Sequence, residues 1–248
     1  MFGIYTSRAI RAPRAGIKHN QIFGPFWAGF AVWLVRPIER ALVARRVSPI
    51  VITLTSLFAC AVGGVAIATD HLAAGALLYL TGGILDLLDG RLARALGRQS
   101  EAGALFDSVS DRWAELAMLA GFAWRLRDDG AWPLAVMAAI AGSLMVSYTR
   151  ARAEGFGLEL KSGAMQRAER ILLVVLGTLL AAAFSARPST AGYVTSTLGI
   201  TLALCGGLSI WTAIGRWVEG YRALCARAVG AKLVTLRIPT DEPPKGRR

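Results

Sequence analysis

Long apolar segments recur along this chain, and they constrain its fold more than any other feature of the sequence. A membrane-spanning helix needs about 20 mostly apolar residues to cross roughly 30 Å of hydrocarbon. Six segments have or approach this length, the third only when polar residues near its start are included. They are residues 47–69, 71–85, 103–124, 130–149, 171–186 (which can extend back to 166) and 188–215. We therefore predict an all-α integral membrane protein with six transmembrane helices.

The composition argues against several other classes of protein. Hydrophobic residues make up 54% of the 248 residues and charged residues only 18%, whereas soluble domains average about 45–50% and 25%. The chain is therefore unlike an ordinary soluble enzyme and unlike a disordered protein. Its three cysteines are scattered and it has two histidines, too few for a disulfide framework or for a zinc site built from His and Cys.

Basic residues follow a pattern of membrane topology. The chain has 28 Lys and Arg against 16 Asp and Glu. Of these 28, 24 lie before the first span, between spans two and three, between spans four and five, or after span six. Because cytoplasmic loops carry an excess of Lys and Arg, we predict a protein of the inner (plasma) membrane with both termini in the cytosol. The basic face suits anionic lipid, and no nucleic-acid partner is expected.

The segment before the first span is shorter and differs in character. We predict an interfacial amphipathic helix over residues 24–46, with four aromatic side chains turned toward lipid: Phe26, Trp27, Phe30 and Trp33. A signal peptide is disfavoured because no small-residue cleavage site follows, and a seventh span is the alternative. The predicted organisation is a basic cytosolic segment at 1–23, one membrane domain at 24–227 and a cytosolic tail at 228–248.

Four aspartates flank the turn between the second and third spans. Asp86 and Asp89 are three residues apart, and Asp107 and Asp111 are four apart, so each pair shares one face of its helix. Such carboxylates repel one another unless cations neutralise them, and acids within a membrane are usually functional. Oxygen ligands without His or Cys suit Mg²⁺ or Mn²⁺. Four carboxylates can hold two such ions for phosphoryl transfer.

Other interpretations of this acidic cluster remain open from the residues alone. The aspartates could be solvated helix ends, part of an ion or proton pathway, or surface groups of a membrane scaffold without catalytic activity. The neighbouring residues favour a phosphate ligand. Gly90 and Gly103 have no side chain and allow a ligand or a helix to approach closely, and Arg94 can complement a phosphate.

The cluster resembles the signature of the CDP-alcohol phosphotransferases, D-x2-D-G-x2-A-R-x8-G-x3-D-x3-D. The eight matching positions are Asp86, Asp89, Gly90, Ala93, Arg94, Gly103, Asp107 and Asp111. The resemblance extends over nearly the whole chain and implies a fold with six spans and a preceding interfacial helix. It also implies transfer of a substituted phosphate from a CDP-linked donor to an alcohol with release of CMP, and a homodimer.

The resemblance assigns roles to individual residues. Asp86, Asp89 and Asp107 would be the principal metal ligands, and Asp111 would accept the proton of the acceptor hydroxyl while also able to touch metal. The cytidine diphosphate would lie against Gly90, Ala93, Arg94 and Asp107. A family element with the pattern Pro-Asn-x-x-Thr would line the same site through Pro49 and Thr53, although Ile50 replaces its Asn.

Four arginines near the cytosolic ends of later spans bear on the acceptor: Arg150, Arg152, Arg167 and Arg216. Guanidinium groups suit a phosphate dianion, although arginines at span ends also fix topology and reach lipid headgroups. The pattern around these arginines resembles that of bacterial phosphatidylinositol-phosphate synthases. The resemblance therefore implies CDP-diacylglycerol as donor and inositol phosphate as acceptor, the four arginines binding its phosphate. Synthesis of phosphatidylglycerol phosphate, or transfer to another head group, is the alternative.

Overall fold

The computed structural model describes residues 25–160, 163 and 165–236, and within them it contains helices and no strand. The helices, in chain order, are α1 (Pro25–Ala44), α2 (Pro49–Ala68), α3 (Leu72–Ala95), α4 (Glu101–Arg125), α5 (Trp132–Gly155), α6 (Arg167–Ser185), the short 3-10 helix η1 (Ala191–Tyr193) and α7 (Val194–Leu236). The prediction of an all-α protein is confirmed for this part of the chain.

Five helical segments are long and apolar enough to cross a membrane. They are Pro49–Ala68, Leu72–Ala95, Trp132–Gly155, Arg167–Ser185 and Ala191–Ala228. The third of the six predicted spans does form a helix, α4, but it is not among these five. Its 25 residues include six that are charged: Glu101, Asp107, Asp111, Arg112, Glu115 and Arg125. The protein is therefore a helical membrane protein with five clear candidate spans.

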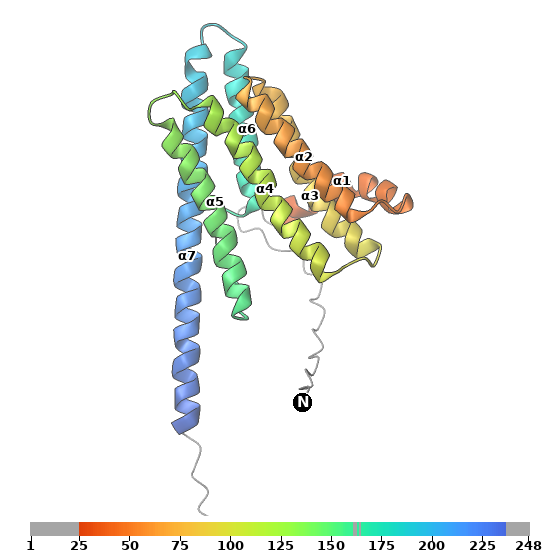
Figure 1. The fold of residues 1–248 in the computed structure, drawn as a ribbon, viewed down its shortest axis with the longest axis vertical. Helices are drawn as coiled ribbons and strands as arrows, with labels where there is room; N and C mark the ends of the chain where they lie inside the picture. Colours follow the sequence, from red (N-terminus) through yellow and green to blue (C-terminus); the bar gives the residue numbers. More distant parts are fainter. Residues whose placement is uncertain (1–24, 161–162, 164, 237–248) are drawn as a thin grey trace, which may run out of the picture.

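The helices form one bundle around a buried apolar core (Figure 1). Helix α2 packs against both α3 and α4, α3 also packs against α6, and α7 packs against α5 and α6. The approach of α2 to α4 is close because glycines face each other there. A Cβ atom on Gly121 would lie 2.1 Å from the backbone oxygen of Gly64, so neither position has room for a side chain.

One end of the bundle gathers the segments that carry the predicted site. The links α2–α3, α4–α5 and α6–α7 lie together at the other end (Figure 1). The site end therefore holds the starts of α2, α4 and α6 and the end of α3. The tight α3–α4 turn there includes Gly97 with a φ of +63°, a conformation that favours glycine.

Helix α1 lies crosswise to the bundle (Figure 1). Val35 on α1 packs with Leu88 and Leu92 of α3, and Glu39 accepts two hydrogen bonds from Arg91 of α3. A helix is thus present where the sequence predicts an interfacial one. The side chains of Phe26, Trp27, Phe30 and Trp33 lie outside the described side chains, so their predicted contact with lipid stays a prediction.

The C-terminal helix is longer than the sequence analysis predicts. Helix α7 continues without interruption past residue 215, where the sixth span is expected to end, and reaches Leu236. The predicted boundary between membrane domain and tail, at residue 227, therefore falls inside a helix. Once a helix has formed, each further residue adds one backbone hydrogen bond, so a helix can continue past its apolar part and hydropathy alone does not locate its end. The predicted segment 1–23 and residues 237–248 lie outside the described residues.

Candidate active site

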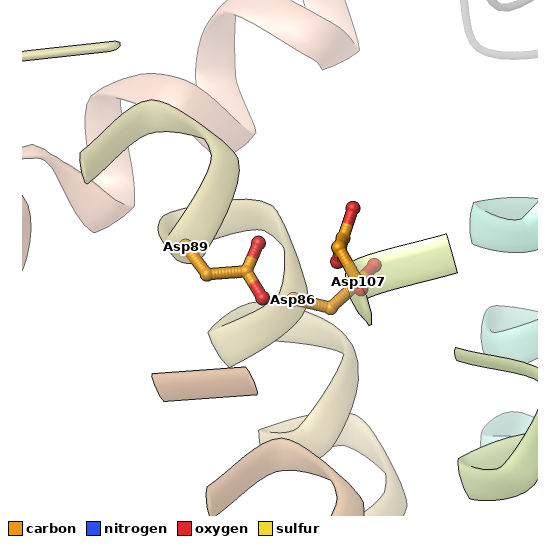
Figure 2. Close-up of side chains that lie close together, drawn as sticks. All are labelled: Asp86, Asp89 and Asp107. Atoms are coloured by element: carbon orange, nitrogen blue, oxygen red, sulfur yellow. The ribbon is translucent and has the colours of Figure 1, made fainter. Parts of the chain in front are cut away.

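Three aspartates from two helices converge at the site end of the bundle. Asp86 and Asp89 project from α3 and Asp107 projects from α4, and their carboxylates point toward one another in Figure 2. One carboxylate oxygen from each lies within 4.8 Å of the others. Helix α3 makes this possible because it continues through the acidic motif, which keeps Asp86 and Asp89 on one face. This oxygen-only donor set fits a hard divalent cation.

The hydroxyl of Thr53 holds one of these carboxylates in place. Thr53 is the fifth residue of α2, and its Oγ1 donates a hydrogen bond of 2.7 Å to Oδ2 of Asp89. Both residues are buried, with 5% and 3% of their surface exposed. A buried carboxylate that accepts such a bond is fixed in orientation, as metal ligands commonly are.

The fourth predicted ligand, Asp111, is placed differently. It lies one turn further along α4 than Asp107 and is not part of the convergent triad. Oδ1 of Asp111 forms an ion pair with Nη1 of Arg167, at 2.7 Å. Nε of the same arginine lies 3.3 Å from Oδ2 of Asp86. Arg167 on α6 thus bridges two aspartates from two other helices. The structure therefore brings the four aspartates into one neighbourhood, with three in a group that can bind metal.

A cleft of about 640 Å³ opens beside Asp89 and Asp107. All six residues predicted to contact the cytidine diphosphate line this cleft, namely Pro49, Thr53, Gly90, Ala93, Arg94 and Asp107. The cleft is also bordered by the starts of α2 and α4, and helix N-termini attract anions through their free N–H groups. Ser100 caps α4 here by accepting a hydrogen bond of 3.0 Å from the N–H of Gly103.

Sequence reasoning did not single out every residue around the cleft. Arg98 and Gln99 of the α3–α4 turn and Glu101, the first residue of α4, also line it. Their positions fall among the eight variable residues of the signature, so no fixed letter points to them. The signal in the sequence that could have found them is the short turn. Because it connects the two helices that carry the aspartates, its residues must lie close to those aspartates.

The four predicted acceptor arginines are not in one contact group. Arg167 lies among the aspartates, whereas Arg150 pairs with Glu154 on the surface of α5 at 2.9 Å. Arg152 lies over the ring of Phe156, 4.4 Å from its centre. Arg216 on α7 is buried and donates a hydrogen bond of 3.0 Å to the carbonyl of Val146.

These arginines nevertheless share a region at the site end of the bundle. Arg150 and Arg152 lie in the last two turns of α5, Arg167 begins α6, and Arg216 of α7 is hydrogen-bonded to Val146 of α5. Arg170 was not among the predicted site residues. It forms a buried pair with Glu115 of α4, with contacts of 2.7 and 3.1 Å. The spacing of Glu115 from Asp111, four residues, is the signal in the sequence that could have found this pair.

Fold and site together define a helical membrane protein with a carboxylate cluster for a divalent cation beside a cleft for an anion. A sequence profile described as CDP-alcohol phosphatidyltransferase matches residues 46–213, more than half of the chain. The chain therefore belongs to the CDP-alcohol phosphatidyltransferase family. It is accordingly an enzyme that transfers a phosphatidyl-type group from a CDP-linked donor to an alcohol. The family replaces the alternative predictions of a transporter and of a scaffold without catalytic activity.

Relatives and solved structures agree with this family. The phosphatidylinositol phosphate synthase of Mycobacteroides abscessus is 30% identical over 155 residues, which are 61% of this chain and 70% of that protein. The phosphatidylinositol phosphate synthase of Mycobacterium tuberculosis with CDP-DAG bound is 27% identical, covers 75% of this chain and 92% of its own, and has a TM-score of 0.64. The same enzyme in complex with manganese and citrate covers 75% and 88% at 27% identity, with a TM-score of 0.65.

Proposed function

We propose that this protein transfers the phosphatidyl group of CDP-diacylglycerol to a hydroxyl of inositol phosphate and releases CMP. The observation that carries the proposal is one continuous site. The cleft lined by Gly90, Arg94 and Asp107 adjoins the aspartates, and Arg167, which is outside the cleft lining, contacts Asp86 and Asp111. The named relatives are phosphatidylinositol phosphate synthases, and a solved structure of one holds CDP-DAG.

The cleft suits the diphosphate of the donor. Arg94 and Arg98 supply positive charge, and the starts of α2 and α4 add the partial positive charge of helix N-termini. Gly90 leaves the wall of the cleft open, because a Cβ atom there would meet only Arg94, at 3.6 Å. The acyl chains can stay in the bilayer because the cleft lies at one end of helices that are apolar enough to span it.

Asp86, Asp89 and Asp107 would hold the metal, which we propose to be two Mg²⁺ ions, with Mn²⁺ as a substitute and Asp111 as a further ligand. Such ions supply charge stabilisation to the phosphoryl oxygens and to the leaving CMP. The triad supports this assignment because three carboxylate oxygens lie within 4.8 Å of one another and the group contains no His or Cys. Thr53 orients Asp89 for this task.

Asp111 is the group that takes the proton from the acceptor hydroxyl. The hydroxyl oxygen forms the new bond to the β-phosphorus of the donor, and the bond from that phosphorus to CMP breaks. Arg167 contacts Asp111 and Asp86, so it fixes the orientation of the base. Together with Arg150, Arg152 and Arg216 it provides the positive charge for the acceptor phosphate, and positioning of this kind accounts for most of the rate gain in phosphoryl transfer.

We further propose that α4 is a sixth span, that α1 lies in the interface, and that the site and both termini face the cytosol in the inner membrane. Two acidic side chains of α4 are neutralised inside the bundle, since Asp111 pairs with Arg167 and Glu115 pairs with Arg170. Paired acids of this kind are compatible with a span. The homodimer implied by the family resemblance is part of the same proposal.

Lipid product analysis tests the reaction. Purified protein with Mg²⁺ and CDP-diacylglycerol is offered inositol phosphate, inositol or glycerol phosphate, and we expect a lipid product and CMP only with inositol phosphate. Asp111→Asn should lower turnover by about 100-fold or more, the usual effect of losing a general base. Asp128→Asn, whose side chain is exposed at the other end of the molecule, is the control. Product from glycerol phosphate alone would replace this proposal with synthesis of phosphatidylglycerol phosphate.

A further inference from the structure

A second acid–arginine pair lies next to the pair in the active site. Asp111 pairs with Arg167, and one turn further into the bundle Glu115 pairs with Arg170. Nε and Nη2 of Arg170 lie 2.7 and 3.1 Å from the two carboxylate oxygens of Glu115, so the guanidinium group binds the carboxylate with two parallel hydrogen bonds. The side chains are 3% and 10% exposed, which makes the pair more buried than any of the catalytic contacts of Arg167.

The spacing of these residues places both pairs between the same two helices. Asp111 and Glu115 are four residues apart on α4, and Arg167 and Arg170 are three apart on α6, so each couple shares one face of its helix. Among the described residues, the backbones of α4 and α6 do not pack against each other directly. The long arginine side chains bridge that space. The distance and register between α4 and α6 therefore depend on these two pairs and on the apolar residues around them.

The buried pair is connected to the rest of the acceptor side. Nη1 of Arg170 donates a hydrogen bond of 3.2 Å to the carbonyl of Met165, in the segment just before α6. The N–H of Met165 donates in turn to Oγ1 of Thr212 on α7, at 3.3 Å. Thr212 lies one turn before Arg216, and all of these residues are buried. The pair thus links α4 to the start of α6 and to the part of α7 that carries Arg216.

Stability alone is a weak explanation for such a pair. Desolvating two charges costs free energy that their attraction roughly offsets, so a buried ion pair adds little net stability compared with apolar residues of the same size. What the two parallel hydrogen bonds do provide is a fixed geometry, because they form only at one register of the two helices. Neither Glu115 nor Arg170 is among the described residues that line the donor cleft.

We infer that Glu115, through Arg170, is a positioning residue for the acceptor half of the reaction. It sets the register between the helix that carries the proposed base, Asp111, and the helix that carries Arg167. This inference rests on the proposed function. The inference predicts different effects on the two substrates. The donor cleft is formed by α2, α3 and the start of α4, and the Glu115–Arg170 pair lies outside that cleft. Loss of the pair should therefore affect the acceptor more than the donor.

The test compares Glu115→Gln and Glu115→Asp with the wild-type protein. Gln keeps the shape and removes the charge, and Asp keeps the charge but shortens the reach. We expect both to raise the KM for the acceptor by about tenfold or more, as small misplacements of reacting groups do. The KM for CDP-diacylglycerol and the binding of CMP with Mg²⁺, measured by titration, should stay within about twofold of wild type. Arg170→Lys should have an intermediate effect.

Asp129→Asn is the matched control, since it removes an acid that pairs with Arg125 at the other end of α4. Retained CMP binding shows that a variant is folded, and Glu115→Asp serves if Glu115→Gln does not fold. An unchanged acceptor KM in folded variants, or an equal rise in donor KM, would overturn the inference. The acceptor is whichever alcohol the wild type uses in the product analysis. If the inositol phosphate assignment is wrong, the product analysis of the wild type shows it. If the positioning role is wrong, only the KM values of the variants show it.

Discussion

At the scale of single residues, the aspartates are oriented by neutral as well as by charged partners. Asp89 is almost completely buried and receives its hydrogen bond from the hydroxyl of Thr53, whereas Asp86 and Asp111 face a guanidinium group. A hydroxyl orients a carboxylate without adding an opposite charge, so the contact that Thr53 makes with Asp89 is a neutral one. Asp86 shares Arg167 with Asp111, and its charge is partly compensated within the protein. Within the triad, Asp89 is therefore held by a neutral hydroxyl and Asp86 by a charged guanidinium group.

Replacing Thr53 by Val should weaken the use of metal. The change keeps the shape of the side chain but removes the donor to Asp89, and loss of such outer partners typically lowers metal affinity or activity about 10- to 100-fold. We expect a higher Mg²⁺ or Mn²⁺ concentration for half-maximal activity, measured by metal titration. Thr55→Val is the control, because the hydroxyl of Thr55 donates only to Val51 in its own helix. Superimposable titration curves for Thr53→Val and wild type would contradict the role of the hydroxyl.

Residue positions within one helix could be predicted from the sequence, and pairings between helices could not. The spacing of Asp86 and Asp89 determines that they share a face of α3, whatever surrounds them. The partner of Arg167 depends on how α6 packs against α3 and α4, which no local pattern records. The sequence analysis therefore grouped Arg167 with Arg150 and Arg152, whereas in the structure Arg167 contacts Asp86 and Asp111.

At the scale of helices, the position of α4 depends on residues without side chains. Gly64 of α2 and Gly121 of α4 let the two backbones touch, as small residues do in membrane helix packing. Helix α4 has few direct contacts with α3, its neighbour in sequence, and α2 packs against both. The crossing at Gly64 and Gly121 therefore determines where Asp107 and Asp111 lie relative to α3.

Gly121→Ala should destabilise the protein, although Ala is normally the better helix former. In a helix, Gly to Ala stabilises by about 0.5–1 kcal/mol, but here the new Cβ atom would lie 2.1 Å from backbone oxygen. Forcing extra volume into such a contact costs about 1–3 kcal/mol. We expect a lower Tm in detergent and reduced activity. Gly207→Ala, where a Cβ atom meets nothing within 4 Å, should leave Tm unchanged or raise it. Equal Tm values for the two variants would argue against the crossing.

Hydropathy predicted five of the spans well because their apolar residues extend through most of the helix. It was less informative for α4 and for the end of α7. The charges of Asp111 and Glu115 lower the hydropathy of α4, yet they are paired with arginines of α6 that no sequence window around α4 contains. Helix α7 continues beyond its apolar part, where Arg227 donates to the carbonyls of Phe156 and Gly157 at the end of α5. Contacts with residues far away in the sequence therefore stabilise helical segments whose length and position cannot be predicted from local composition.

At the scale of the whole molecule, the clustered basic residues and the candidate active site lie at the same end of the bundle. The starts of α2, α4 and α6 and the ends of α3 and α5 lie at one end of the bundle, α7 extends past that end, and the opposite end carries the short α6–α7 link (Figure 1). The cleft is lined by the starts of α2 and α4 and the end of α3. A soluble acceptor and the released CMP must reach this end from water, whereas the donor arrives through the bilayer. The distribution of Lys and Arg favours the cytosol as that compartment. Orientation is therefore a functional property of this enzyme, and the cysteines offer a direct way to measure it.

Labelling of Cys225 with a membrane-impermeant maleimide tests the orientation. Cys225 is exposed on the extension of α7, whereas Cys60 and Cys205 are buried, at 1% and 3% exposure, and should not react. In a bacterial inner membrane we expect Cys225 to stay unlabelled in intact spheroplasts and to react in inside-out vesicles, because the distribution of Lys and Arg predicts that the basic end faces the cytosol. Ser189→Cys in a Cys225→Ser background, placed in the exposed α6–α7 link, should give the reverse pattern. Labelling of Cys225 from outside intact spheroplasts would put the active site on the wrong side for a cytosolic acceptor.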